Sequence, residues 1–215
     1  LDYPSLVRII NDVQPDEIYN LGAMSHVRVS FDMPSFTIQT NALGVLNMLE
    51  VYRTLCPEAK FYQASSSEMF GNSVDESPRR GSNFVTNKVV KGAVAIKKGL
   101  QDKLELGNMD SYRDWGHSKD YVRAMHMIVN HDVADEFIVA TGDTHSVRDL
   151  CEIVFSKLNM NYEDYVVQNP KYMRPEELKY LKGDSSKARK LLGWKPDYTF
   201  ESMLEEMIER WQQEL

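Results

Sequence analysis

The sequence predicts an α/β fold, in which a doubly wound parallel sheet is joined to a smaller C-terminal α/β lobe. In the first half of the 215 residues, helical and strand-like patterns alternate at short intervals. Crossover helices between parallel strands require this alternation. The second half is less regular, with helical patterns and short strand-like runs.

The first half contains two helix-to-strand successions. One helix carries apolar residues on a single face, followed by a turn at 14–16 and a strand over 17–21. A second helix is expected from Pro34 to a point before Pro57, with the next strand over 61–65. The apolar positions of the two helices are Leu6, Ile9, Ile10, Val13, Ile38, Ala42, Val45, Leu46 and Leu49. Both strands lead into loops with small and polar residues, and open α/β sheets bind ligands beyond such strand ends.

The second half is predicted to contain a basic helix over 83–98, a short strand over 103–106, a helix over 118–131 and a strand over 136–140. Residues 144–146 offer caps for a further helix. That helix and the last one carry apolar stripes that predict core packing. Their positions are Val147, Leu150, Val154 and Leu158, then Phe200, Met203, Leu204, Met207, Ile208 and Trp211.

Composition excludes several classes of function. The chain has 25 Lys and Arg against 32 Asp and Glu, a net charge of −7, which argues against a nucleic-acid or anionic-membrane surface. No apolar run is long enough to span a bilayer, and no basic-then-apolar leader opens the sequence. Cys56 and Cys151 have no metal-site spacing, so we expect no metal and a reduced cytoplasmic setting, while a disulfide between them stays open.

Two loops after predicted strands are candidates for ligand binding. The stretch 19–26 places Gly22 and Ala23 directly after a strand, so that a ligand could approach the backbone, although a Gly-Ala turn is also common without a ligand. The stretch 63–71 places hydroxyls and Glu68 just beyond a strand, where they could bind a substrate oxygen and move a proton. Its alternative is a Ser-rich turn with a solvated Glu.

Three further segments carry arginines. The adjacent Arg79 and Arg80 suit bidentate phosphate binding, but a solvated basic turn would look the same. Arg113 lies beside Trp115, which is expected to be structural. Arg174 precedes a Pro that could begin a helix, and by itself would be no more than part of a cap.

Taken in order, these segments resemble the GDP-mannose 4,6-dehydratase family, whose members are extended short-chain dehydrogenases with a Rossmann-like sheet. The resemblance rests on VQPDEIYNLGAMSHV, FYQASSSEMFG, SPRRGSNFVTNK, LGNMDSYRDWGHSKDYV, MRPEE and LKGDSSKARKLLGW. Six segments in the family's order are far more specific than any one of them. The segments around Arg80 and Arg113 separate this family from epimerases of the same fold.

The resemblance assigns roles to individual residues. Ser66 matches a catalytic Thr of the family and keeps its hydroxyl, and Glu68 matches the catalytic Glu. Phe36 stands where the family has a cofactor-contacting Tyr. The cofactor NADP is expected to contact Leu21, Gly22, Ala23, Met24, Ser25 and Arg80. The substrate GDP-mannose is expected to contact Ser66, Asn83, Lys88, Arg113, Arg174 and Glu177.

The implied reaction converts GDP-mannose to GDP-4-keto-6-deoxymannose with internal redox cycling of NADP. Oxidation at carbon 4 of the sugar acidifies the proton at carbon 5, which Glu68 would remove while water leaves carbon 6. The resemblance also implies a homo-oligomer, a dimer or a tetramer. The alternatives are another NAD(P)-dependent sugar-nucleotide epimerase or reductase, and a non-catalytic protein that binds nucleotide sugars.

Two motifs of the family are absent from the sequence. No two of the 11 glycines lie closer than seven positions, so no glycine-rich phosphate loop can be written, and no Tyr is followed by Lys four positions later. We therefore expect that family segments, including the first strands of the sheet, are missing before Leu1 and at the junction of Glu76 and Ser77. Residues 1–76 are predicted to form a partial NADP-binding domain. Residues 77–215 are predicted to form mainly the substrate lobe, with some segments returning to the sheet.

Overall fold

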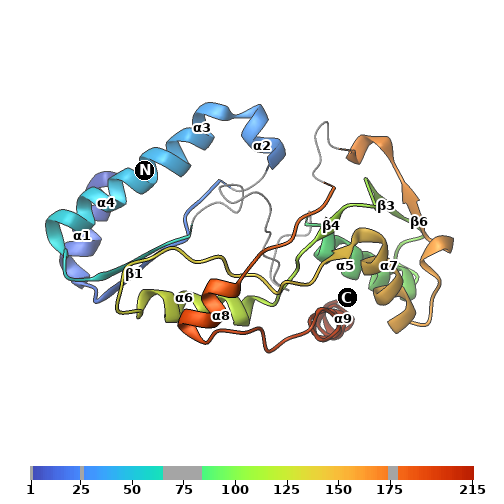
Figure 1. Cartoon of the computed structure of the whole chain (residues 1–215). Helices are drawn as coiled ribbons and strands as arrows, with labels where there is room; N and C mark the ends of the chain where they lie inside the picture. The colour runs from blue at the N-terminus through green and yellow to red at the C-terminus, as the bar shows by residue number, and fades with distance from the viewer. Residues whose placement is uncertain (1, 25–26, 65–83, 174–178) are drawn as a thin grey trace. The chain divides into compact units, whose positions relative to one another are not determined.

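The computed structural model describes residues 2–24, 27–64, 84–173 and 179–215. These residues form two compact units (Figure 1). The first contains the described residues up to 64 together with Ile128–Ala134, and the second contains 84–127 and 135–215. The predicted boundary between Glu76 and Ser77 lies outside the described residues.

The first unit is built on a parallel pair of strands. Helix α1 (Tyr3–Val13) begins at Asp2, whose carboxylate accepts a hydrogen bond from the Ser5 amide at 3.3 Å. Strand β1 (Glu17–Asn20) pairs in parallel with β2 (Lys60–Gln63). The predicted strands over 17–21 and 61–65 are confirmed, each with small shifts at its ends. The buried core of this unit consists of Ile10, Ile18, Val51, Cys56 and Ala59.

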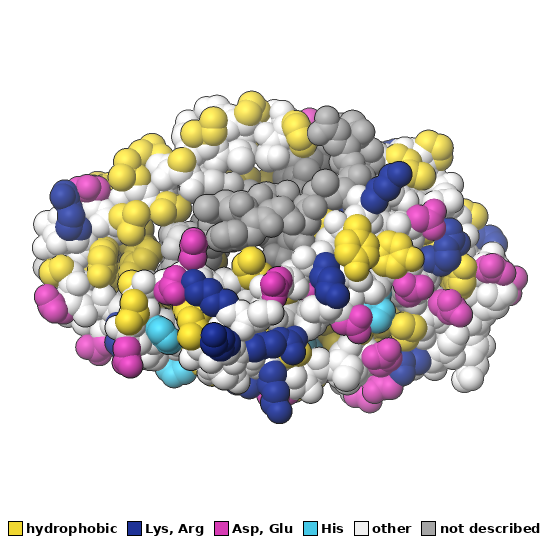
Figure 2. Space-filling view, in the orientation of Figure 1, with side chains coloured by type: hydrophobic (Ala, Val, Ile, Leu, Met, Phe, Trp, Pro, Cys, Tyr) yellow, Lys and Arg dark blue, Asp and Glu magenta, His cyan; other side chains and the backbone are white. Residues whose placement is uncertain are grey.

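The helix predicted after Pro34 forms, but with a change of pitch. After α2 (Val27–Asp32), the chain forms α3 (Pro34–Ile38), a π-helical stretch (Gln39–Leu43) and α4 (Gly44–Leu55). Ile38, Leu46 and Leu49 of the predicted stripe are exposed, on both sides of the π-helical stretch, because no described segment packs over them. Hydrophobic side chains are visible along α3 and α4 in Figure 2. Val51 is buried instead.

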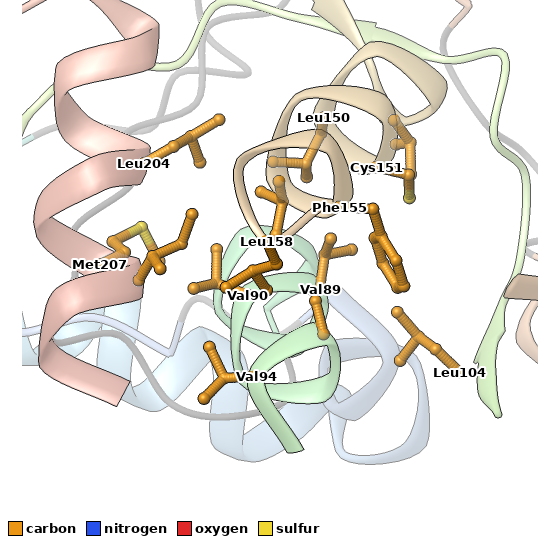
Figure 3. Close-up of a cluster of buried hydrophobic side chains, with 14 of the residues drawn as sticks. Val89, Val90, Val94, Leu104, Leu150, Cys151, Phe155, Leu158, Leu204 and Met207 are labelled. Carbon is orange, nitrogen blue, oxygen red and sulfur yellow. The ribbon is translucent and has the colours of Figure 1, made fainter. Parts of the chain in front are cut away.

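The second unit is held by three helices and a strand. Helices α5 (Val85–Lys97), α7 (Val147–Lys157) and α9 (Phe200–Glu214) bury their apolar faces against one another and against β3 (Leu104–Leu106). Figure 3 shows these side chains converging between the helices. The apolar stripes predicted for α7 and α9 are thus confirmed as core, with Trp211 only partly buried. Strand β3 pairs in parallel with β6 (Val166–Gln168).

The remaining elements flank this core. Strand β4 (Tyr112–Arg113) pairs in antiparallel fashion with β5 (His145–Ser146). Helix α6 (Ser118–Val129) and α8 (Ser186–Leu192) contribute to a smaller cluster around Trp194. Short 3₁₀ turns lie at Tyr162–Asp164 and Pro170–Tyr172.

Three expectations concern local features of the chain. The strand predicted over 136–140 is wrong, because this segment has no ladder partner among the described residues. Cys56 and Cys151 are both buried and free, so the possible disulfide is not formed. Among the described helices, none combines the length and hydropathy that a membrane crossing requires.

Candidate functional site

The loop that follows β1 is held by side-chain amides at both ends. Asn20 Oδ1 accepts a hydrogen bond from the Gly22 amide at 3.3 Å, and Asn20 Nδ2 donates to Gln63 Oε1 of β2 at 2.8 Å. At the other end, Asn41 accepts from the Met24 amide at 2.6 Å and donates to the Met24 carbonyl at 3.1 Å. These contacts fix the path of the backbone from the end of β1 to Met24.

The same loop presents an open backbone face. Leu21, Gly22 and Ala23 are exposed. A Cβ added to Gly22 would meet only the Asn20 side chain, at 3.4 Å, within ordinary contact range. A flat polar ring could therefore lie against this stretch and reach its peptide groups. Four of the five loop residues predicted to contact the cofactor, 21–24, are described.

Several predicted site residues lie outside the described residues. They include both catalytic candidates and are Ser25, Ser66, Glu68, Arg80, Asn83, Arg174 and Glu177. The described candidates on the substrate side are Lys88 and Arg113, which both belong to the second unit.

Lys88 is half-buried on α5, beside a hollow of about 390 Å³. Its Nζ donates to the Glu105 carbonyl at 2.6 Å and lies 4.0 Å from the centre of the Tyr172 ring. Burial lowers the pKa of the Lys88 ammonium, and the Glu105 carboxylate opposes that shift. Lys91 and Lys103 also line the hollow. The site combines cations with an aromatic face, a combination suited to a phosphorylated ligand that carries a ring.

Arg113 lies on a strand that is held along both edges. Its neighbour Tyr112 pairs with Ser146 of β5. On the other edge, the Tyr112 amide donates to the Lys179 carbonyl at 2.9 Å and the Leu181 amide donates to the Tyr112 carbonyl at 3.1 Å. The Arg113 Nη1 also donates to the Tyr112 carbonyl, at 2.7 Å. The guanidinium therefore projects from a backbone with little freedom.

Sequence reasoning missed the buried polar residues of the segment 106–122. Asp114, His117 and Asp120 are each at most 2% exposed. Asp120 accepts hydrogen bonds from the amides of Asp197 and Tyr198 at 3.0 and 3.1 Å. Trp115, predicted to be structural, is confirmed as such, stacking on Phe200 with ring centres 5.4 Å apart.

No metal centre is found in the part of the chain that the structure describes: no group of three or more His, Cys, Asp or Glu there could hold an ion.

Solved structures share the fold of this chain. The RMD protein of Pseudomonas aeruginosa complexed with NADPH superposes with a TM-score of 0.88 at 20% identity, covering 100% of this chain and 86% of that one. The UDP-glucose 4-epimerase of Thermotoga maritima with UDP-glucose gives 0.85 at 18% identity, covering 99% and 82%. The dTDP-glucose 4,6-dehydratase of Bacillus anthracis with NAD gives 0.76 at 17% identity, covering 99% and 77%. The predicted α/β, Rossmann-like fold is confirmed.

Several curated proteins share a higher sequence identity with this chain than these structures do. The chain is 38% identical to GDP-mannose 4,6 dehydratase 2 of Arabidopsis thaliana, covering 97% of this chain and 69% of the relative. It is 37% identical to GDP-mannose 4,6-dehydratase of Vibrio cholerae, covering 96% and 76%. With the human GDP-mannose 4,6 dehydratase the identity is 35%, covering 96% and 73%.

These matches also locate the position at which a segment of the family has no counterpart in this chain. The Arabidopsis alignment extends over 256 positions, more than the 215 residues of the whole chain, so part of the relative has no counterpart here. The family model for GDP-mannose 4,6 dehydratase matches in two pieces, residues 1–76 and 73–207. The pieces meet where the sequence analysis expected a missing segment. Because the model matches nearly the whole chain, the chain belongs to the GDP-mannose 4,6-dehydratase family.

Proposed function

We propose that this protein is a lyase that converts GDP-mannose to GDP-4-keto-6-deoxymannose by removing water. The observation that carries the proposal is the family match over residues 1–76 and 73–207, with relatives named GDP-mannose 4,6-dehydratase in plants, animals and bacteria. A fold shared with epimerases at under 25% identity does not distinguish between reactions. The ordered motifs favour dehydration over the epimerase and reductase alternatives.

The loop 21–24 supports a nicotinamide cofactor, and we propose NADP. Its exposed backbone beside Gly22 fits a ribose and nicotinamide. The sequence contains no glycine-rich loop for the pyrophosphate, so the fit extends to one end of the cofactor only. When bound, NADP supplies hydride acceptance and return. Leu21, Gly22, Ala23 and Met24 would hold the ring side, with Ser25 and Arg80 as further contacts.

The hollow beside Lys88 supports binding of the GDP half of the substrate. Lys88, Lys91 and Lys103 line it together with Tyr172, and the Lys88 ammonium lies 4.0 Å from the centre of the Tyr172 ring. A cation beside an aromatic ring suits a ligand that combines a phosphate with a purine. Arg113 would contribute a guanidinium from the rigid β4 segment. Asn83, Arg174 and Glu177 complete the proposed substrate contacts.

Two lysine variants on α5 test whether the hollow binds GDP. Lys88→Met removes a cation that lines it, whereas Lys97→Met removes one from the exposed last turn of the same helix, outside the hollow. We expect Lys88→Met to weaken GDP binding about 10-fold to 100-fold, the range for a lost charge-assisted hydrogen bond. Lys97→Met should bind GDP as the wild type does. Equal affinities for all three proteins would remove Lys88 from the site.

The catalytic roles are proposed for Ser66 and Glu68. The Ser66 hydroxyl would hold the oxygen on carbon 4 of the mannose, and the Glu68 carboxylate would take the proton from carbon 5 and assist the loss of water from carbon 6. The family's Tyr–Lys pair, which would act as base at oxygen 4, has no counterpart in this sequence.

Mass spectrometry of the reaction product tests the proposal directly. The product of the complete gene is incubated with GDP-mannose and NADP, with the Vibrio cholerae relative as positive control. A sugar nucleotide lighter by one water supports the dehydratase, whereas a product of unchanged mass indicates an epimerase. Binding without turnover indicates the non-catalytic alternative. Glu68→Gln should bind GDP-mannose but release no water, and normal product formation by this variant would reject the role of Glu68.

Two further proposals concern the setting of the protein. A cytoplasmic location fits the two free, buried cysteines, since reduced thiols are typical of that compartment. The family resemblance suggests a homo-oligomer, either a dimer or a tetramer. Size-exclusion chromatography with light scattering measures its mass, and a monomer at working concentrations would refute the oligomer.

A further inference from the structure

The Asp114 carboxylate joins three segments of the second unit. It is 1% exposed, directly after β4. Its Oδ1 accepts hydrogen bonds from the Thr141 amide at 3.0 Å and the Thr141 hydroxyl at 2.6 Å. Its Oδ2 accepts from the Gly142 amide at 2.9 Å and the Gly183 amide at 3.3 Å. One side chain thus connects positions 27, 28 and 69 residues away along the chain.

These donors lie on the segments that border the strand of Arg113. Thr141 and Gly142 begin the loop that leads into β5, and Gly142 has a left-handed backbone with φ of 82°. Gly183 belongs to the segment that pairs with Tyr112 through Lys179 and Leu181. The carboxylate therefore fixes the two neighbours of β4 relative to β4 itself.

The consequence falls on Arg113. Successive side chains of an extended segment point to opposite faces. Because the hydrogen bonds hold the Asp114 side chain towards the interior, they also set the direction in which the Arg113 side chain leaves the strand. A long, flexible guanidinium binds a phosphate more tightly when its backbone does not have to be ordered at the moment of binding. Asp114 supplies that order without being a ligand contact.

We propose that Asp114 is a positioning residue for the nucleotide sugar, because it holds Arg113 and the segment 179–183 in one binding arrangement. The inference rests on the proposed function, in which Arg113 contacts the substrate. A positioning role and a purely structural role predict different results. If Asp114 positions Arg113, loss of Asp114 should weaken substrate binding by more than an equally destabilising change elsewhere.

Asp120 offers a matched control. It is a second buried carboxylate of the same motif, 2% exposed, and it accepts amide hydrogen bonds from Asp197 and Tyr198, away from the segments bound to Asp114. Asp114→Asn places an NH₂ group against either the Gly142 and Gly183 amides or the Thr141 amide and hydroxyl. The hydroxyl can turn to accept, so at least one amide hydrogen bond is lost in either orientation. Asp120→Asn creates a comparable conflict at its own site, and it also removes the charge that pairs with Arg123 at 3.0 Å. Thr141→Val is a milder change that removes the 2.6 Å hydroxyl bond and keeps the shape.

The experiment measures GDP-mannose affinity by calorimetry, KM and kcat, melting temperature, and amide hydrogen exchange over 179–183, all on the product of the complete gene. We expect Asp114→Asn to raise Kd and KM about tenfold or more, and Thr141→Val about threefold to tenfold, as expected for lost buried hydrogen bonds. Amide exchange over 179–183 should become faster in both. Asp120→Asn should lower the melting temperature but keep Kd within about twofold of the wild type.

Several outcomes would overturn the inference. It fails if folded Asp114→Asn binds GDP-mannose as tightly as the wild type, or if Asp120→Asn weakens binding equally. Should Asp114→Asn not fold, Thr141→Val decides: unchanged affinity and unchanged exchange overturn the role. If the wild type does not bind GDP-mannose at all, the proposed function fails. The exchange data then still test the anchor, because faster exchange over 179–183 must be confined to the Asp114 and Thr141 variants.

Discussion

Truncation of Leu204 to alanine tests whether α9 is an integral part of the core of the second unit. The Leu204 side chain is fully buried, in the cluster that α9 forms with α5 and α7 (Figure 3). Its neighbours there include Val90, Val94 and Leu150, which are also at most 1% exposed. Such close packing leaves little room for the core to collapse around a cavity. The expected loss of unfolding free energy is therefore about 2–5 kcal/mol.

The expected change in melting temperature follows from this loss of free energy and from the length of the chain. For a protein of this length, each kcal/mol corresponds to about 2–4 °C, so Leu204→Ala should lower Tm by about 4–20 °C. Far-UV circular dichroism during heating and during urea unfolding measures both quantities. The control is Glu209→Ala, an exposed position on the same helix where the effect should be within about 0.5 kcal/mol. If the two variants melt alike, α9 is not packed as described and the reasoning is refuted.

Three further predictions concern pH, thiol reactivity and backbone packing. Burial lowers the pKa of His117 below 6.5, although the Glu206 carboxylate, with Oε2 3.3 Å from Nε2, opposes the shift. As the pH falls, the unfolded chain takes up the proton on His117 first, so the stability contributed by neutral His117 is fully present above pH 6.5 and is lost as the pH drops towards the pKa of the folded protein. His117→Gln should flatten this part of a plot of urea midpoint against pH. An unchanged slope would contradict the prediction. Burial raises the pKa of Cys151 to about 12 despite the nearby Arg148, so iodoacetamide should modify this thiol only in urea, as peptide mass mapping can check; rapid labelling of the folded protein would contradict the burial. Gly107→Ala should destabilise by about 1–3 kcal/mol in urea unfolding, because the new Cβ would lie 2.3 Å from the Tyr172 carbonyl oxygen; an unchanged midpoint would show that this backbone can move.

Local patterns in the sequence predicted most of the helices and strands. Helix α1, and the cap and apolar stripe of α7, arise from residues within a few positions of one another. Helical spacing also identified the buried residues of α9. Such features depend on near neighbours, so a single sequence contains the information needed to predict them.

Other features depended on partners far along the chain. Residues 136–140 have a strand-like composition but no ladder partner among the described residues, and a strand exists only where a second one pairs with it. Ile38, Leu46 and Leu49 have the apolar spacing of a buried helix face but are exposed, because no described segment packs over them, and apolar spacing does not show what covers a face.

The sequence by itself determined the family, through six motifs in a fixed order, and with it the proposed chemistry of Ser66 and Glu68. Only the tertiary structure showed what the buried acids of the longest motif do. Asp114 meets Gly183 across 69 positions and Asp120 meets Tyr198 across 78. The sequence does not show from which distant amides a carboxylate will accept hydrogen bonds, because the packing of the segments selects those donors. Buried polar groups must find partners wherever the fold places them.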